Sequence, residues 1–211
     1  MTIANRKERQ KEELRGKILE AAKDLFIKRG YDETSIRNIA ERIEYSPTTI
    51  YLYFKDKDDI FYALHREGFV LLNQYLRVLQ NVEDPFERLK AICKAYITFA
   101  KENGEFYDLM FISRAPMNAL LKETHPEKWE EGNKAFGALI GTVAECIAEG
   151  YFKGMDPEIL SFTCWSMVHG IVSLEIRGRC SPISEMNQVD LSTKAVEIIV
   201  QMLDRMHPSI K

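Results

Sequence analysis

Residues 34–64, TSIRNIAERIEYSPTTIYLYFKDKDDIFYAL, contain the pattern that decides the fold of this chain. In the first part of the stretch, Ile36, Ile39, Ala40 and Ile43 recur at steps of three and four residues. This spacing predicts a short helix with one apolar face. The alanine at the centre of that face is small enough to let a second helix cross closely.

A second short helix is expected directly after a tight turn. Ser46 is suited to be its N-cap, and Pro47 to be its first residue, because Pro has no amide hydrogen to leave unpaired there. Ile50 and Phe54 share its inward face. The other side chains of the segment then point outward, and they are Pro47, Thr48, Thr49, Tyr51, Leu52 and Tyr53.

Hydroxyls and aromatic rings on an outward helix are suited to DNA. Thr and Ser bind base edges or phosphates, and a Leu or Thr methyl group can meet a thymine methyl. A helix-turn-helix places its second helix in the major groove and its first across the backbone. An ordinary hairpin of two helices has the same spacing, so spacing alone leaves both interpretations open.

The residues themselves resemble a known family. The patterns Gly-Tyr-x-x-Thr-Ser-Ile-Arg-Asn-Ile-Ala at 30–40 and Ser-x-x-Thr-Ile-Tyr-x-Tyr-Phe-Lys-x-Lys-x-x-Ile-Phe at 46–61 are similar to the N-terminal domain of TetR-family transcriptional regulators. The resemblance implies that residues 46–49 and Leu52 face bases. It also implies that one set of side chains holds the DNA backbone, namely Ser35, Tyr51, Tyr53 and Lys57. We add Thr34 and Arg37, at the start of the first helix of the pair, as candidate DNA-binding residues.

Two positions depart from the family pattern. Glu44 and Thr48 stand where the family usually or often has Gly. Glu44 must either adopt a left-handed conformation or reshape the turn. Thr48 adds a side chain at the floor of the groove. Both departures bear on the base contacts that the resemblance implies.

The rest of the chain is predicted to be helical throughout. A first helix is expected from near Lys11 to Arg29, with Gly30 ending it, and a long helix from Lys57 to about Gln80. We therefore expect an all-α protein of about nine helices. A three-helix DNA-binding domain with a helix-turn-helix would occupy residues 1–56, and a helical ligand-binding and dimerisation domain residues 57–211.

Two C-terminal helices favour self-association. The helix from Pro157 to Arg177 is apolar nearly all round, and the last helix, opened by Asp190, has a broad apolar face. A chain of 211 residues has little left to cover both, so a two-fold dimer is the economical solution. Candidate interface residues are Met167, Gly170, Leu174, Ile198 and Met202.

The segment from Trp165 to Ile171 also resembles a TetR subgroup named for a Trp-His-Gly signature. The alternative is structural. Gly170 would then only allow close helix packing, and His169 would be a hydrogen-bonded core residue.

Aromatic and sulfur-containing side chains gather in the middle helices and suggest a site for a flat or elongated apolar molecule. His169, Tyr107 or Asn133 could orient its polar end. A solid core is the alternative, and only the resemblance to ligand-responsive regulators favours a cavity. The candidate ligand-binding residues are Tyr96, Phe99, Phe106, Tyr107, Met110, Phe136, Ile140, Trp165 and His169.

Composition limits the remaining classes of protein. The net charge is −3, and residues 1–65 carry 13 Lys and Arg against 12 Asp and Glu, so DNA binding must use a focused basic patch. The densest basic cluster, which either touches DNA or is only solvated, is Arg6, Lys7, Arg9, Lys11, Arg15 and Lys17.

Other features point to a cytoplasmic protein without a cofactor. The four Cys are scattered and read as reduced thiols, and the Cys and His spacing does not favour a metal site. No stretch resembles a membrane span or signal core, and no catalytic motif is present.

We thus expect a non-enzymatic, homodimeric repressor released from a near-palindromic operator in double-stranded DNA by a small, largely apolar effector. The alternative is an activator or scaffold whose helical body binds a protein partner instead of a small molecule.

Overall fold

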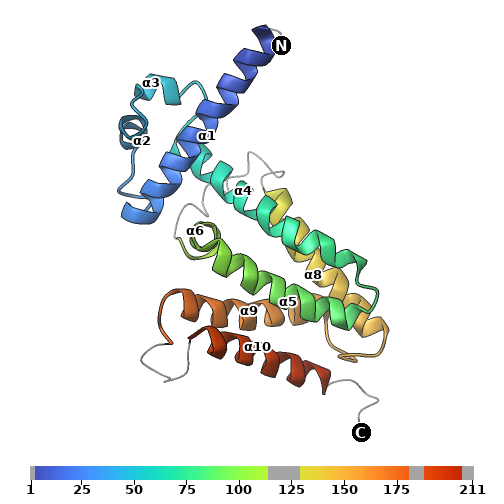
Figure 1. The fold of residues 1–211 in the computed structure, drawn as a ribbon. Coiled ribbons are helices and arrows are strands. Elements are labelled where there is room, and N and C mark those ends of the chain that lie inside the picture. Colours follow the sequence, from blue (N-terminus) through green and yellow to red (C-terminus); the bar gives the residue numbers. More distant parts are fainter. Residues whose placement is uncertain (1–2, 114–128, 181–187, 206–211) are drawn as a thin grey trace. The chain divides into compact units, whose positions relative to one another are not determined.

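The computed structural model describes residues 3–113, 129–180 and 188–205 of the chain. Within these ranges it contains nine α-helices, a 3₁₀ turn and a π-helical turn, and no strand (Figure 1). This confirms the predicted all-α class. The chain divides into two compact units, residues 1–69 with 105–129 and residues 70–104 with 130–211.

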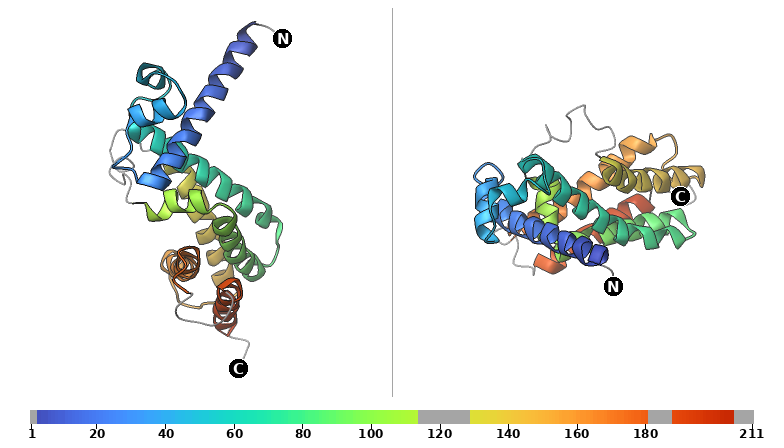
Figure 2. Two further views of the ribbon diagram at one scale, coloured as in Figure 1. Left: turned by 60° about the vertical axis from the view of Figure 1, so that its left-hand side comes forward. Right: turned by 90° about the horizontal axis from the view of Figure 1, so that it is seen from above.

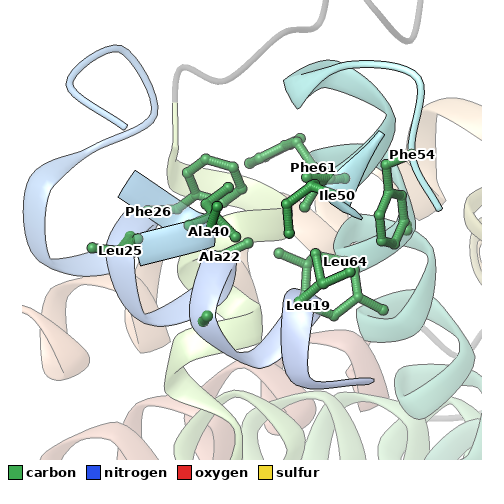
Figure 3. Close-up of a cluster of buried hydrophobic side chains, with 14 of the residues drawn as sticks. Leu19, Ala22, Leu25, Phe26, Ala40, Ile50, Phe54, Phe61 and Leu64 are labelled. Carbon is green, nitrogen blue, oxygen red and sulfur yellow. The ribbon is translucent and has the colours of Figure 1, made fainter. Parts of the chain in front are cut away.

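The first unit is built around one apolar core. Ile18 and Ala22 of the first helix, Ile39 and Ala40 of the second, and Ile50 of the third are all 0% exposed. Figure 3 shows side chains from four helices meeting in this core. These helices are α1 (Ile3–Arg29), α2 (Ile36–Arg42), α3 (Pro47–Ile50) and the first part of α4 (Lys57–Arg77).

The turn after α2 adopts the first of the two conformations considered above. Glu44 has φ +60°, in the left-handed region. Its N–H donates to the carbonyl of Glu41 at 3.3 Å, and the N–H of Tyr45 donates to the carbonyl of Ala40 at 3.0 Å. This pair of bonds is the Schellman motif, which normally places Gly at the left-handed position.

α3 is shorter than the predicted helix, which extended to Phe54. After Ile50 the chain continues with bonds of the i to i+3 type, from Leu52 to Thr49 and from Tyr53 to Ile50. The segment is rich in β-branched and aromatic residues, which lose side-chain freedom in a helix. Its ends are nevertheless fixed, because Ser46 caps the first turn and Phe54 is buried.

α1 begins at Ile3, earlier than the predicted start near Lys11. The added turns are formed mainly by Arg, Lys, Glu and Gln, which are good helix formers. Arg9 and Glu13 form an ion pair of 3.2 Å at helical spacing. In both Figure 1 and Figure 2 this N-terminal part of α1 extends beyond α2 and α3.

The second unit is a helical bundle. α5 (Pro85–Glu102) packs against both α8 (Glu130–Ala148) and α9 (Pro157–Ile176). α10 (Gln188–Asp204) packs against α9, and Figure 2 shows these two helices side by side. The sequence predicts helix starts at Asp84-Pro85 and Asp156-Pro157. In the structure the two Asp side chains cap α5 and α9 ahead of the first-turn Pro.

Several predicted boundaries differ from the observed ones. α4 ends at Arg77 and is followed by a 3₁₀ turn, Val78–Asn81, in place of a helix to Gln80. The last helix begins at Gln188 and not at Asp190. The sequence also predicts a loop from Ser113 to Thr124 and a helix that starts at His125; apart from Ser113, these residues lie outside the described ranges.

The segment from 104 to 112 is not a single regular helix. α6 (Gly104–Tyr107) is followed by a π-helical turn, Asp108–Ile112. Such turns widen the helix locally and are frequent at functional sites.

The conformation of Glu44 gives a prediction of stability. Glu44→Gly should raise the free energy of unfolding by about 1 kcal/mol, because Gly has no Cβ to oppose a positive φ. Chemical denaturation monitored by circular dichroism measures the change.

Glu41→Gly is the matched control, since it makes the same replacement within regular helix three residues earlier. It should lower the free energy of unfolding by about 1 kcal/mol. If Glu44→Gly destabilised the protein as Glu41→Gly does, the left-handed conformation of Glu44 would not be strained.

Candidate nucleic-acid interface and effector region

Most of the residues selected as DNA contacts lie on the surface of the first unit. Leu52 is 76% exposed and Tyr51 is 57% exposed, which is unusual for large apolar or aromatic side chains without a partner. Ser35, Arg37, Ser46, Pro47 and Thr48 are also exposed, whereas Thr49, Tyr53 and Lys57 are half-buried.

The two serines of the site are held as helix caps. Ser35 Oγ accepts from the backbone N–H of Asn38 at 3.1 Å, and the Asn38 side chain accepts from the Ser35 N–H in return. Ser46 Oγ accepts from the backbone N–H of Thr49 at 3.2 Å. These bonds satisfy free first-turn amides and fix the start of both helices.

Two candidate residues have other contacts. Thr34 is 1% exposed and its hydroxyl donates to the carbonyl of Gly30 at 2.8 Å. It is therefore placed to hold the end of α1, and its burial keeps it from reaching DNA in this conformation. Lys57 Nζ donates to the carbonyl of Tyr31 at 2.7 Å and lies 4.0 Å from the centre of its ring. A phosphate would have to compete with Tyr31 for this ammonium group.

Three of the candidate ligand residues belong to the first unit. Tyr107 is fully buried, Met110 is 8% exposed, and Phe106 packs against the core of the unit. A Cβ placed on Gly68 of α4 would clash with Met110 Sδ. The segment of residues 105–112 is therefore in close contact with α4 in this unit.

A second group of candidate ligand residues meets in the second unit. Tyr96 Oη and His169 Nδ1 are hydrogen-bonded at 2.9 Å, and the ring of Trp165 lies 5.6 Å from that of His169. The ring of Phe136 lies 6.2 Å from that of Trp165. Burial lowers the pKa of His169, so its neutral form is favoured.

The remaining ligand candidates are placed differently. Phe99 is fully buried, and its ring packs edge-on against that of Tyr75 at 5.8 Å. Ile140 is half-buried, while Asn133 is exposed on α8. The aromatic set predicted as one cluster is thus divided between the two compact units.

The predicted dimer residues lie on an exposed apolar face of α9 and α10. Leu174 is 50% exposed, Ile198 is 53% exposed and Met202 is 60% exposed. A Cβ on Gly170 would meet open space, so this glycine is not required for packing within the chain. A groove of about 700 Å³ crosses this face and is lined by Met155, Asp156, Ile159, Leu160, Thr163, Met167, Ile199, Met202, Leu203 and Arg205.

α9 is long and apolar enough to cross a membrane by length and composition, although we expected no stretch to approach a membrane span. An 18-residue window of the helix has a mean hydropathy of 1.4, and 28% of that window is buried within the chain. A core helix of a soluble protein can have the same composition, but such a helix is mostly buried, whereas much of α9 is exposed in the single chain.

The periodicity did not single out His65 as a functional residue. It is 4% exposed in α4, between Phe61 and Phe69, and burial lowers its pKa to about 4. Its hydrogen bond to the backbone of Met110 is a second contact between α4 and the 105–112 segment. The only signal in the sequence was its place on the inward stripe of the helix.

Burial also governs the cysteines. Cys93, Cys146 and Cys164 are buried, and desolvation raises the pKa of each thiol, to about 11 for Cys164. The scattered cysteines of the sequence are expected to be mostly core side chains, and three of the four are buried as expected.

Two family descriptions match this chain. Residues 18–64 match "Bacterial regulatory proteins, tetR family", and residues 89–197 match "Tetracyclin repressor-like, C-terminal domain". Together they cover both the helix-turn-helix and most of the second unit. The second match does not confirm the Trp-His-Gly subgroup.

Curated relatives are transcription regulators. The chain is 30% identical over 102 residues to the HTH-type transcriptional activator FasR of Mycolicibacterium smegmatis, covering 48% of this chain and 47% of that protein. This match therefore spans about half the length of FasR. The chain is 24% identical over 187 residues to the fatty acid metabolism regulator protein of Bacillus subtilis, covering 87% of this chain and 92% of that protein.

Solved structures share the fold. FadR from Bacillus subtilis in complex with stearoyl-CoA matches with a TM-score of 0.66 at 19% identity, covering 87% of this chain and 96% of that one. AibR in complex with isovaleryl coenzyme A and operator DNA matches with a TM-score of 0.68 at 22% identity, covering 88% and 95%.

The close approach of Gly68 to Met110 gives a second prediction. Gly68→Ala should lower the free energy of unfolding by about 1–3 kcal/mol, because the new methyl group displaces Met110 and approaches Phe106. The cost should shrink in a Met110→Ala background, which a double-mutant cycle by chemical denaturation would show.

Gly16→Ala in α1 is the matched control, since nothing lies within 4 Å of the added Cβ. It should stabilise the protein by up to about 1 kcal/mol through helix propensity. Equal effects of the two replacements would exclude a tight contact at Gly68.

Proposed function

We infer the function from the family: the chain belongs to the TetR family of bacterial regulatory proteins, so it is a DNA-binding transcriptional regulator. Within that role we propose a repressor that binds a near-palindromic operator and is released by a small, largely apolar ligand. The observation that carries the DNA-binding part is the exposed face of α3 and the turn after it. Leu52 and Thr48 project there from a segment whose polar backbone is capped by Ser46.

The two roles divide along the chain. Residues 1–56 would read DNA, and residues 57–211 would bind the effector and a second copy. Ser46, Pro47, Thr48 and Leu52 are suited to meet base edges, and Ser35, Tyr51 and Tyr53 to hold phosphates. Arg37 is exposed on α2 and could add a phosphate contact, although it now pairs with Glu41 at 2.9 Å.

Dimerisation through α9 and α10 supports the operator geometry. A second copy would cover the exposed apolar face that contains Leu174, Ile198 and Met202, and the groove beside it. A two-fold dimer would present two α3 segments to half-sites about 34–36 Å apart, or a multiple of this distance.

For the effector we propose an acyl-coenzyme A. FadR and AibR, whose folds match, are described with stearoyl-CoA and isovaleryl coenzyme A. In this chain the aromatic group of Phe136, Trp165 and Tyr96 is suited to an apolar acyl chain. The hydroxyl of Tyr96 and the imidazole of His169 could orient the thioester carbonyl.

Release requires that the ligand prefer one of two conformers. We propose that binding shifts the 104–112 segment and thereby moves α4. The contacts of Met110 with Gly68 and His65 support this part of the proposal, because α4 cannot stay in place if that segment moves toward it.

A second candidate function keeps the DNA-binding role but activates transcription in place of repressing it. The relative FasR is an activator by name, so a DNA-bound activator whose helical body binds a protein partner is the alternative. We propose no catalytic activity and a cytoplasmic location, where chromosomal DNA is accessible.

The base-reading role gives a third prediction. Thr48→Ala and Leu52→Ala should each weaken binding to a duplex selected by the protein from a random pool by about 1–2 kcal/mol, or roughly 5- to 30-fold. Binding to an unselected duplex should not change, since phosphate contacts dominate it. Fluorescence anisotropy with both duplexes measures the two affinities.

Val78→Ala is the matched control, because Val78 is a 64% exposed apolar residue of the second unit. Equal losses on both duplexes would mean that Thr48 and Leu52 do not read bases. A selection that enriched no inverted repeat would contradict the operator proposal.

The effector proposal gives a fourth prediction. Saturating stearoyl-CoA or isovaleryl-CoA should weaken binding to the selected duplex by about 5- to 150-fold, which is the usual range of coupling between two sites. Free coenzyme A should not. Tyr96→Phe should reduce the response by weakening ligand binding, whereas Tyr75→Phe, which removes a hydrogen bond to Glu102, should leave it unchanged.

Titration of the ligand by calorimetry separates the two stages. Ligand binding without any change in DNA affinity would contradict release. Absence of binding by either thioester would contradict the acyl-CoA class.

A further inference from the structure

A polar groove of about 480 Å³ lies in the first unit, between α1 and the two ends of the α3 segment. Of the residues proposed above to hold phosphates, Tyr53 lines this groove, and its lysines belong to the basic cluster of the sequence, which either touches DNA or is only solvated. Its lining comes from about three turns of α1 and from two tyrosines. It consists of Lys7, Gln10, Lys11, Glu13, Leu14, Lys17, Tyr45 and Tyr53.

The helix side of the groove is a stripe of lysines. Lys7, Lys11 and Lys17 fall with Leu14 on one face of α1, at steps of three and four residues. They are spaced about 6 and 9 Å along the helix axis at 1.5 Å per residue. All three are exposed, and none forms a hydrogen bond or ion pair in the described part of the chain.

The charge of the groove is positive. Its single carboxylate, Glu13, is paired with Arg9 at 3.2 Å on the same helix. This leaves three ammonium groups without a counter-charge in a protein whose net charge is −3. A concentration of unpaired cations in a concave surface attracts anions, because the low-dielectric walls focus the field.

The opposite side of the groove is continuous with the recognition segment. Tyr45 is 44% exposed and directly precedes Ser46, the N-cap of α3. Tyr53 follows α3, and with Leu14 it packs against the core of the unit. The groove thus adjoins the segment that presents Thr48 and Leu52, and two tyrosines line its wall.

We propose that this groove holds the phosphodiester backbone of the DNA beside the bases that α3 reads. Lys7, Lys11 and Lys17 neutralise phosphates there, and Tyr45 and Tyr53 contact the same strand. The proposal rests on the DNA-binding function above and extends the phosphate contacts from Ser35, Tyr51 and Tyr53 to the lysines of α1. It gives a role to the N-terminal turns of α1, which begins at Ile3, well before the part of the helix that is buried in the core.

The test measures how affinity depends on salt. Each phosphate neutralised contributes about 0.9 to the slope of log affinity against log salt concentration. The triple variant Lys7→Gln, Lys11→Gln, Lys17→Gln should therefore lower the slope by up to about 5 for a dimer, which carries two such grooves. The probes are the selected duplex and an unselected duplex, each of about 40 base pairs, or roughly four helical turns.

Two control proteins make the result specific. The triple Lys94→Gln, Lys153→Gln, Lys194→Gln removes the same charge from exposed positions of the second unit and should leave the slope unchanged. Replacing the three groove lysines by Arg keeps the charge and should restore the slope. The affinity ratio between the selected and unselected duplexes should stay the same in all variants, and thermal unfolding should show equal stability.

Each outcome decides the matter. Equal slopes for the two Gln triples would overturn the groove proposal while leaving the DNA-binding function intact. A loss of the affinity ratio without a change in slope would also overturn it, because the lysines would then position α3 and not hold phosphates. Failure of the wild-type protein to prefer any selected duplex would overturn the proposed function, and the groove proposal with it.

Discussion

The apolar core shared by α1, α2 and α3 is the constraint on which the DNA-reading surface depends. Ile39, Ala40 and Ile50 are completely buried in the core that α2 and α3 share with α1 and α4. Because these residues fix the inward face of α3, they also fix its outward face. The exposure of Leu52 and Thr48 is therefore a consequence of the core, not of the surface itself.

Short helices need help from outside their own hydrogen bonds, since nucleation is costly. α2 has seven residues and α3 has four, and each begins at a serine cap. The turn between them closes with a Schellman motif in spite of Glu44. Local polar bonds and a shared core thus replace the length that an independent helix requires, and they define the conformation of the recognition segment although little of it is regular helix.

Local signals explain which features could be predicted from the sequence. The helical class, the inward residues of the first unit, the Asp-Pro helix starts and the end of α1 at Gly30 depend on periodicity and capping, which neighbouring residues determine. The length of α3, the π-helical turn after Tyr107 and the burial of Thr34 depend on tertiary packing. The aromatic residues show the same limit, because their spacing places them inward without specifying the unit in which they meet.

The exposed apolar face of α9 and α10 has a consequence for temperature. Contacts between apolar surfaces near room temperature are driven by the entropy of water, and they weaken on cooling. If a second copy covers Ile198 and Met202, the association holding the two reading segments in register is weaker in the cold than at growth temperature. A chilled, dilute sample would then lose operator occupancy by dissociation of the subunits, while each separate helical bundle stayed folded.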